Sequence, residues 1–209
     1  MTLLVVTAVD AEAQAVARGL PAGADVLTAP VGVGPAAAAA GTARLLALAG
    51  GRYRAVVSAG IGGGIGLAPG ATVLASRSIA ADLGADSPDG FLSLDELGFG
   101  SALAPVDAGL LDRLRAALPG AAVGDVLTVS TVTGTVAGTA ELLRRHPDAL
   151  AEAMEGYGVA CAAQGAGLPF AELRTISNPV GPRDRAAWRI GDALAALTHA
   201  APAFATLLG

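Results

Sequence analysis

The chain contains no lysine, so all 13 of its basic side chains are arginines. Without lysine, chemistry that needs a Schiff-base amine or a phosphate-loop lysine is excluded. Cysteine and histidine are nearly absent too. The single cysteine, Cys161, has no second cysteine for an intramolecular disulfide, and His146 and His199 lie too far apart in the sequence for metal-ligand spacing. We therefore expect a cytoplasmic protein that holds no structural metal and no cofactor.

Positive charge is scarce as well. The 209 residues carry a net charge of −5 and a pI near 4.9, which gives no electrostatic reason to bind nucleic acid or an anionic membrane. The opening apolar run meets Asp10 well before the ~20 apolar residues that a membrane span needs. We expect a soluble protein with a small neutral or locally matched ligand, and no nucleic-acid or membrane partner.

Apolar residues are abundant, 53% of the total. This composition and length predict one domain over residues 1–209 with one large core. Strands are predicted at residues 3–9, 24–29, 55–59, 71–79, 123–129 and 170–176, and helices at about 10–20, 35–49, 107–118, 138–146, 149–165 and 184–198. The alternation predicts an α/β fold, a single three-layer domain with a mixed central β-sheet flanked by helices.

A glycine-rich segment over residues 60–66 follows one of the predicted strands. It lacks both the glycine spacing and the following helix of a dinucleotide loop. It is therefore either a tight turn or a floor for a purine or a sugar, and we favour the floor, with Gly60, Ile61 and Gly62 as contacts.

Two other segments have less specific interpretations. Residues 31–35 contain a second glycine turn, which is most simply a strand-to-helix connection. Residues 83–100 are acidic and glycine-rich, and a long segment of this kind is a lid, an interface or a solvated surface excursion.

Three polar side chains lie near the ends of predicted strands, where open α/β sheets bind ligands. Glu12 follows the first strand, and its position alone favours the solvent face of the next helix over a cleft. Glu155 lies in an Ala/Val-rich segment that we expect to be buried, so its carboxylate needs donors such as ribose hydroxyls. Asn178 ends a strand, although a turn before Pro179 would also explain an asparagine there.

The motifs around these residues resemble the nucleoside phosphorylase and nucleosidase superfamily over nearly the whole chain. Residues 6–12 are similar to the family's first strand and the loop with the carboxylate that activates water, and residues 58–63 to its glycine strand under the nucleoside. Ala-Met-Glu-Gly at 153–156 resembles the segment whose Glu holds the ribose hydroxyls. Arg-Thr-Ile-Ser-Asn at 174–178 resembles the Arg-x-Ile-Ser-Asp segment of methylthioadenosine and S-adenosylhomocysteine nucleosidases.

Two positions depart from that nucleosidase pattern. The terminal Asp of the last segment is Asn178, and a serine expected near the glycines is Ile61. The two changes are consistent with each other, because a serine whose role is to orient a carboxylic acid is not needed when that acid is replaced. With residues 92–98 and 180–189, the pattern is most similar to the futalosine hydrolases, whose substrate is an inosine-like nucleoside of the menaquinone pathway with a carboxyphenyl ketone at the 5′ end.

The resemblance implies hydrolysis of the N-glycosidic bond of futalosine, with release of hypoxanthine. This reaction needs a base for water, negative charge near the ribosyl cation and stabilisation of the leaving base. We assign these roles to Glu12, Glu155 and Asn178, respectively. The remaining expected substrate contacts are Met154, Ser177, Arg183 and, by approximate alignment, Val132 and Thr133.

Asn178 is expected to determine which base is cleaved. Hypoxanthine presents N7 and O6 acceptors, whereas adenine presents an N7 acceptor beside its N6 amino donor. An amide can donate to O6 and offer its carbonyl to N7 as that nitrogen gains a proton, whereas a protonated aspartic acid would set an oxygen against O6. The residue type at 178 therefore favours hypoxanthine.

Other interpretations remain open. Glu12 would repel an attacking phosphate and Arg18 lies a helix turn or more further on, which favours water, but a purine nucleoside phosphorylase or another 6-oxopurine nucleosidase is the alternative. A catalytically silent nucleoside-binding protein is a third. Arg183, with Arg185 and Arg189, either binds the substrate carboxylate or lies on the surface or at an interface. The relatives are multimers, so we expect a homo-oligomer.

Overall fold

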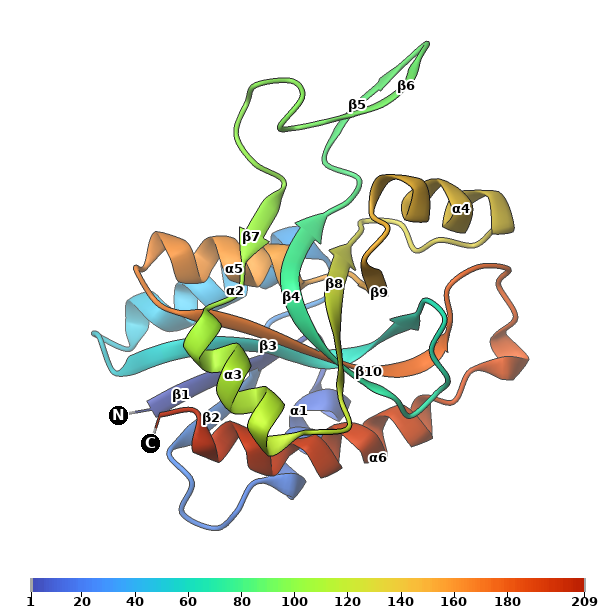
Figure 1. The fold of residues 1–209 in the computed structure, drawn as a ribbon. Coiled ribbons are helices and arrows are strands. Elements are labelled where there is room, and N and C mark those ends of the chain that lie inside the picture. The colour runs from blue at the N-terminus through green and yellow to red at the C-terminus, as the bar shows by residue number, and fades with distance from the viewer. Residues whose placement is uncertain (1, 209) are drawn as a thin grey trace.

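The protein, described over residues 2–208 by a computed structural model, consists of a mixed β-sheet covered by helices (Figure 1). The strands are β1 (Thr2–Thr7), β2 (Val26–Pro30), β3 (Tyr53–Gly64), β4 (Thr72–Ala80), β5 (Gly84–Ser87), β6 (Gly90–Ser93), β7 (Leu103–Pro105), β8 (Ala122–Thr128), β9 (Ala149–Ala153) and β10 (Phe170–Pro179). The helices are α1 (Asp10–Gly19), α2 (Pro35–Leu48), α3 (Ala108–Ala117), α4 (Val136–Arg145), α5 (Gly156–Gly165) and α6 (Ile190–Ala200), with short 3-10 helices η1 (Arg185–Ala187) and η2 (Ala201–Thr206). The predicted α/β fold class is confirmed.

The main sheet has eight strands in the order β10-β4-β8-β9-β3-β1-β2, with β7 paired to β4. Strand β10 also pairs with β3, so β10, β4, β8, β9 and β3 form a closed ring. The pairs β1–β2, β1–β3, β3–β10, β4–β8 and β8–β9 are parallel, and β4–β10, β3–β9 and β4–β7 are antiparallel. This closure brings the carboxyl-terminal halves of β3 and β10 next to β9.

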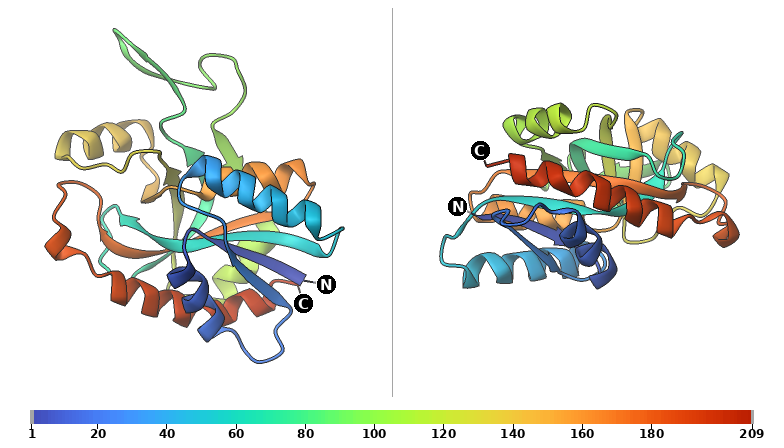
Figure 2. Two further views of the ribbon diagram at one scale, coloured as in Figure 1. Left: turned by 180° about the vertical axis from the view of Figure 1, so that it is seen from behind. Right: turned by 90° about the horizontal axis from the view of Figure 1, so that it is seen from below.

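Strand β1 is apolar on both faces because helices cover both sides of the sheet. Leu3 and Val5 belong to an apolar cluster with α1, α3, α6 and η2, whereas Leu4 and Val6 belong to a second cluster with α2 and α5. Figure 2 shows α2 and α5 side by side, with α6 on the other side of the strands. The sheet is therefore the middle layer of three.

Several element boundaries differ from those that the sequence predicts. Residues 60–64 are not a loop but the second half of β3, and the turn follows at Gly66, whose φ is 69°. Residues 149–153 form β9, whereas the sequence predicts one helix over 149–165. Alanine-rich runs favour this error, since alanine has the highest helix propensity and carries little strand signal.

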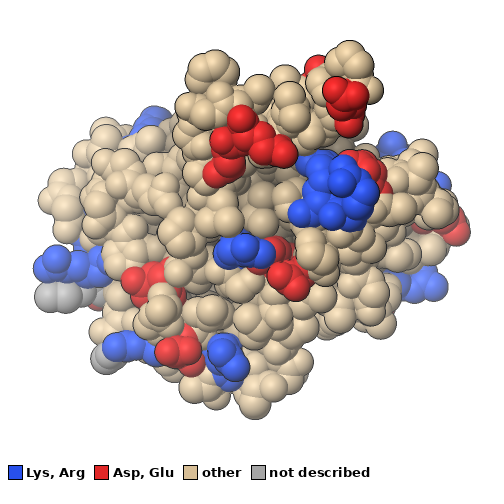
Figure 3. Space-filling view, turned by 45° about the horizontal axis from the view of Figure 1, so that its top comes forward, with Lys and Arg blue, Asp and Glu red and all other residues tan. Residues whose placement is uncertain are grey.

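The segment over residues 83–100 is not wholly irregular. It contains the hairpin β5–β6, which projects from the body of the molecule (Figure 1). The Phe91 ring of this hairpin lies 4.4 Å from the Arg145 guanidinium of α4. Acidic and basic side chains are interspersed over the face seen in Figure 3. Among residues 2–208, none of the helices combines the length and the apolar character that a bilayer span requires.

Candidate active site

Glu12 lies in the first turn of α1, just after β1, and its carboxylate turns back toward the end of that strand. Helix α1 begins at Asp10 with Val9 as its N-cap residue, so Asp10 is not the N-cap that the sequence predicts. The Glu12 carboxylate satisfies the helix start instead: Oε2 accepts hydrogen bonds from the N–H groups of Ala8 (2.9 Å) and Val9 (3.3 Å). Because the side chain turns back toward β1, Glu12 is only 4% exposed and does not lie on the solvent face of the helix.

A further donor to Glu12 comes from β3. The Ile61 N–H donates to Oε1 at 2.8 Å. Gly60 permits this approach, because a Cβ there would lie 2.7 Å from Glu12 Oε1 and 2.8 Å from Arg174 Nη1. A carboxylate has about four lone-pair positions, so the three backbone donors leave one on Oε1 for another donor.

Glu155 lies where the N-termini of two helices meet. It is the N-cap residue of α5, and its Oε1 accepts a hydrogen bond from the N–H of Gly34, the N-cap residue of α2, at 3.2 Å. Its Oε2 accepts from the Met154 N–H (3.3 Å) and from Arg174 Nη1 (3.4 Å). The positive ends of two helix dipoles favour a carboxylate at this point. The glycine turn over residues 31–35 therefore connects a strand to a helix and, through Gly34, also binds the Glu155 carboxylate.

Arg174 is the centre of this cluster and is 1% exposed. Its Nε donates to Glu172 Oε1 (2.9 Å), its Nη1 to Glu155 Oε2, and its Nη2 to Ser58 Oγ (2.8 Å). Burial opposes the charged form of the guanidinium, but Glu172, Glu155 and Glu12 outweigh burial and raise the pKa of Arg174. A fixed positive charge therefore holds these carboxylates in place.

Glu172 is the most deeply enclosed of these acids, at 1% exposed. It precedes Arg174 by two residues on β10, so both side chains point to the same face of the sheet. Its Oε2 has no hydrogen-bond partner among residues 2–208, and burial raises the pKa of Glu172 against the opposing effect of Arg174. Gly156 makes room for the acid, because a Cβ there would lie 2.2 Å from both carboxylate oxygens.

Asn178 lies in a separate cavity of about 90 Å³. A register shift between Ile176 and Asn178, a β-bulge at Ser177, places Asn178 opposite Gly63 of β3. The cavity is lined by Gly63, Val132, Thr133, Glu152, Asn178 and residues of the 179–188 loop, Arg183 and Trp188 among them. Glu12 and Glu155 are not in its lining, so the candidate residues form two groups along β3, one around Arg174 near Ile61 and one in this cavity near Gly63, which we call the two ends of the candidate site.

The side chain of Asn178 is held by its neighbours. The Ser177 hydroxyl donates to Asn178 Oδ1 at 2.7 Å, and Asn178 Nδ2 donates to the carbonyl oxygen of Pro179 at 3.0 Å. The Arg183 guanidinium, at the rim, lies 5.7 Å from the Trp188 ring. Ser177 therefore positions the amide, and its hydroxyl does not line the cavity.

The structure divides the residues that the sequence predicts for the site between the two ends. Glu12, Ile61, Met154 and Glu155 belong to the cluster around Arg174, and Val132, Thr133, Asn178 and Arg183 line the cavity. Gly62 belongs to neither list. A Cβ there would lie 3.7 Å from Arg174 Cβ and 2.9 Å from the Glu152 carbonyl oxygen, so this glycine allows close strand packing, and Gly63 takes its place in the cavity.

Four polar residues of the site were missed by the sequence analysis as site residues: Ser58, Glu152, Glu172 and Arg174. A signal existed for two of them, because two opposite charges at i and i+2 in the apolar strand 170–176 share one face and must pair if buried. Glu152 gave no such signal, because its strand was taken for a helix.

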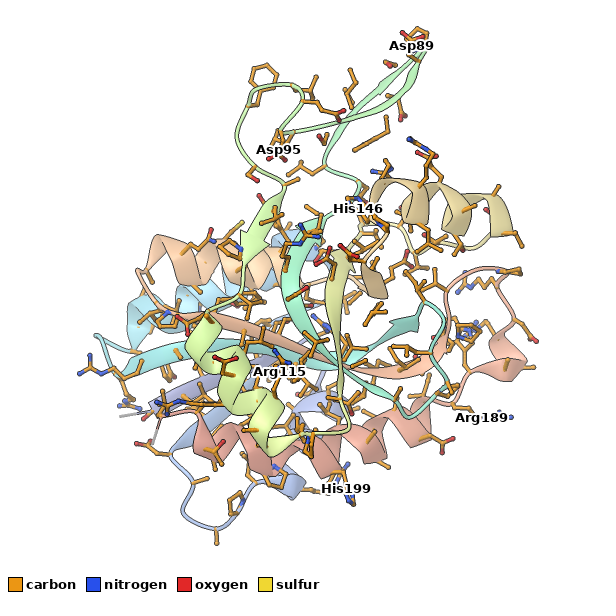
Figure 4. The ribbon with its side chains drawn as sticks, viewed as in Figure 1. Asp89, Asp95, Arg115, His146, Arg189 and His199 are labelled. Atoms are coloured by element: carbon orange, nitrogen blue, oxygen red, sulfur yellow. The ribbon has the colours of Figure 1, made fainter. Side chains whose placement is uncertain are left out.

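The two histidines lie on different sides of the molecule, His146 after α4 and His199 on α6 (Figure 4). Within the described range 2–208, no group of three or more His, Cys, Asp or Glu side chains is placed to hold a metal ion.

Comparisons with known proteins agree with this fold. Residues 7–209 match the model of the phosphorylase superfamily. The chain is 54% identical to a futalosine hydrolase of Streptomyces coelicolor, over 100% of this chain and 97% of that protein. Among solved structures, a 5′-methylthioadenosine/S-adenosylhomocysteine nucleosidase of Colwellia psychrerythraea in complex with adenine superposes with a TM-score of 0.85 at 20% identity, covering 100% of this chain and 96% of that one. A futalosine hydrolase of Helicobacter pylori gives a TM-score of 0.82 at 15% identity, with 98% and 97% covered. The chain therefore belongs to the phosphorylase superfamily and, within it, to the futalosine hydrolase family.

Proposed function

We propose that this protein hydrolyses the N-glycosidic bond of futalosine and releases hypoxanthine and the dehypoxanthinylated ribosyl product. The observation that carries the proposal is the 54% identity to a futalosine hydrolase along the whole chain. The two ends of the site support it, since one suits a ribosyl cation and the other a 6-oxopurine.

At the ribose end, Glu12 is proposed to activate water. Its carboxylate is held by three backbone N–H groups and keeps one acceptor position on Oε1, the oxygen next to Gly60 and Arg174. A water that donates to this position can transfer its proton to the carboxylate as it attacks the anomeric carbon. The buried, fixed carboxylate needs no reorganisation when the proton arrives.

Glu155 is proposed to bind the ribose hydroxyls. Three donors occupy Glu155, one on Oε1 and two on Oε2, so Oε1 keeps a position for a hydroxyl. Negative charge beside the sugar also stabilises the oxocarbenium-like transition state. Arg174 touches no substrate atom in this scheme, and acts as a positioning residue that keeps Glu155 and Glu12 at a fixed separation.

Water is favoured over phosphate as the nucleophile because the backbone N–H groups near Glu12 already have an acceptor. The N–H groups of Ala8, Val9 and Ile61, which an anion would need, already donate to Glu12. The one guanidinium of the cluster, Arg174, is surrounded by carboxylates. A phosphate would therefore meet negative charge and no spare backbone donor there.

At the base end, Asn178 is proposed to stabilise the leaving hypoxanthine. The amide can donate from Nδ2 to O6 and accept N7–H on Oδ1, once Nδ2 leaves the carbonyl oxygen of Pro179. Ser177 keeps Oδ1 oriented through its 2.7 Å hydrogen bond. The amide thus stabilises the negative charge that develops on the base as the glycosidic bond breaks, while N7 takes its proton from solvent water.

The biological setting is part of the same proposal. We propose that the enzyme acts in the cytoplasm in menaquinone biosynthesis, as a homo-oligomer whose whole chain works as one domain. An apolar groove of about 550 Å³ between α2 and α5, lined by residues such as Leu46, Tyr53 and Leu168, supports association. Sedimentation at micromolar concentration tests the oligomeric state.

The experiment for the reaction itself is the release of hypoxanthine from futalosine, followed by chromatography with and without inorganic phosphate. We expect release without phosphate, no stimulation by phosphate, and loss of turnover in Glu12→Gln. A strict phosphate requirement would assign a phosphorylase, and binding without release would assign a silent nucleoside-binding protein.

A further inference from the structure

Glu152 lies on the opposite side of the base cavity from Asn178. It belongs to β9, where it pairs with Gly63, and Gly63 pairs on its other side with Asn178 of β10. Residues paired across neighbouring strands point to the same face, and two strand spacings separate them by roughly 10 Å. A carboxylate and an amide therefore face one cavity from two walls, with a glycine between them.

The carboxylate of Glu152 is nearly enclosed yet incompletely paired. Glu152 is 5% exposed, and its hydrogen bonds come from one residue: the Thr133 N–H donates to Oε1 at 2.8 Å, and the Thr133 hydroxyl donates to Oε2. These bonds use about half of the lone-pair positions of a carboxylate. Burial raises the pKa of Glu152, as expected for an acid short of donors. The unused positions belong to a side chain that lines the cavity.

A 6-oxopurine has the donor that this carboxylate lacks. Along one edge of hypoxanthine the groups follow as N7, O6 and then N1–H, so a base read by an amide at N7 and O6 presents its N1–H next in line. Adenine has an unprotonated N1 at that place, which would set a lone pair against the carboxylate. Position N1 therefore distinguishes hypoxanthine from adenine, in addition to the difference between O6 and the N6 amino group.

We propose that Glu152 accepts the N1–H of the purine and is a second residue that determines selectivity for a 6-oxopurine. The inference rests on the proposed function and adds a contact at N1 to the contacts of Asn178 at N7 and O6. Thr133 then has a positioning role, because its two hydrogen bonds orient the carboxylate toward the cavity.

The test compares Glu152→Gln with the wild-type protein on futalosine and on its 6-amino analogue. The wild type is expected to favour futalosine in kcat/KM. Because a hydrogen bond to a charged acceptor is lost and the Gln amide can donate to N1 of adenine, futalosine should lose about 10- to 100-fold, while the 6-amino analogue changes by less than about threefold. A collapse of the substrate ratio supports the assignment.

Thr133→Val is the matched control, since it removes one hydrogen bond to Glu152 and keeps the carboxylate. Because the carboxylate stays and only its orientation is loosened, the preference for futalosine should narrow in the same direction as in Glu152→Gln but by a smaller factor. If Glu152→Gln lowers kcat/KM for both substrates equally, Glu152 only supports the Thr133 loop and the assignment is wrong.

Direct binding separates this inference from the proposed reaction. By calorimetry, the wild type should bind hypoxanthine at least about 10-fold more tightly than 1-methylhypoxanthine, which has no N1–H, and Glu152→Gln should lose most of that difference. A wild type that releases no hypoxanthine from futalosine contradicts the proposed reaction alone. Equal effects of N1 methylation on both proteins contradict the role of Glu152 alone.

Discussion

The two ends of the site differ in how their polar groups are satisfied. At the ribose end, Glu12, Glu155 and Glu172 surround Arg174, and these residues are at most 6% exposed. At the base end, Asn178 is half-buried and, within residues 2–208, forms hydrogen bonds only with its sequence neighbours, and Glu152 only with Thr133. The first end is a buried network of opposite charges in contact, and the second is a cavity lined by an amide and a carboxylate.

In the proposed mechanism, this difference separates catalysis from specificity. A buried charge network cannot lose a member without leaving a buried charge unpaired, so changes there should reduce both rate and stability for every substrate. Groups with spare hydrogen-bonding capacity can exchange one partner for another, so changes at the base end should alter the ratio between bases. The following predictions test that separation, from the largest expected effect to the smallest.

Glu12→Gln should give the largest loss of rate. Without a base for water, kcat for futalosine should fall about 10²- to 10⁴-fold, with KM changed much less. The loss should be the same factor for the 6-amino analogue. Glu141→Gln, on the exposed face of α4, is the control and should keep full activity. A Glu12→Gln enzyme with wild-type kcat would exclude this residue as the base.

Arg174→Met should be the most destabilising change. Glu172 loses its strongest partner and Glu155 one of its donors, so the free energy of unfolding should fall by about 3–5 kcal/mol. Adding Glu172→Leu should restore part of this stability, because the orphaned acid is then gone, but should not restore turnover. Denaturant unfolding of the wild type, Arg174→Met and the double variant measures this. An Arg174→Met protein with the wild-type midpoint would show that Arg174 does not stabilise these carboxylates.

Asn178→Asp should change selectivity more than stability. The acid opposes O6 of hypoxanthine and matches N6–H of adenine, so kcat/KM for futalosine should fall about 10- to 100-fold while that for the 6-amino analogue rises or holds. Competition between the two substrates in one tube measures the ratio directly. An unchanged ratio would mean that residue 178 does not read the base.

Gly156→Ala tests the packing of the ribose end. The added Cβ would lie 2.2 Å from both Glu172 oxygens, so the acid must shift and stability should fall by about 1–3 kcal/mol, with some loss of activity. Gly165→Ala, on the same helix, would place its Cβ more than 4 Å from any atom of residues 2–208 other than its chain neighbours and the nearby backbone of its own helix. It should be neutral or stabilising by up to ~1 kcal/mol. Equal melting temperatures for the two variants would contradict the tight fit.

Glu152→Gln should change the pH dependence of stability slightly. Because burial raises the pKa of Glu152, the folded wild type holds this proton more tightly than the unfolded chain and loses stability as pH rises from the unfolded-state value, about 4.3, through the raised pKa. Gln lacks this titration, so its stability relative to wild type should grow over that range. Hydrogen bonds from Arg144 lower the pKa of Glu141, so Glu141→Gln should show the opposite trend. Parallel curves for Glu152→Gln and wild type would contradict the burial effect.

Much of the fold follows from local patterns in the sequence. The β1 run Leu3 to Val6 is apolar at every position, which predicts a strand buried on both faces, and the alternation of strands and helices predicts the layers. The β9 strand could not be predicted in this way, because an alanine-rich run of five residues has no periodicity that separates strand from helix. The closure of β10 onto β3 is a non-local pairing that no local pattern encodes.

The candidate site could be inferred where residue type and position coincide. Glu12 and Glu155 lie at helix starts and Asn178 near the end of β10, and motif resemblance identifies them as candidates. Arg174 was quoted within a motif, but its role also depends on the carboxylates of Glu155 and Glu12, from two distant segments that only the folded chain brings together. Position alone placed Glu12 in solvent, because sequence does not show that its carboxylate turns back to the N–H groups of Ala8 and Val9.

The most direct test of the central claim is a phosphate-free competition in which the wild-type protein receives equal amounts of futalosine and its 6-amino analogue, and released hypoxanthine and adenine are quantified together over time. The account predicts hypoxanthine release at least about 100-fold faster than adenine release, in line with the discrimination that buried hydrogen-bonding groups achieve. Equal rates for the two bases, or no release of either until phosphate is added, would contradict it.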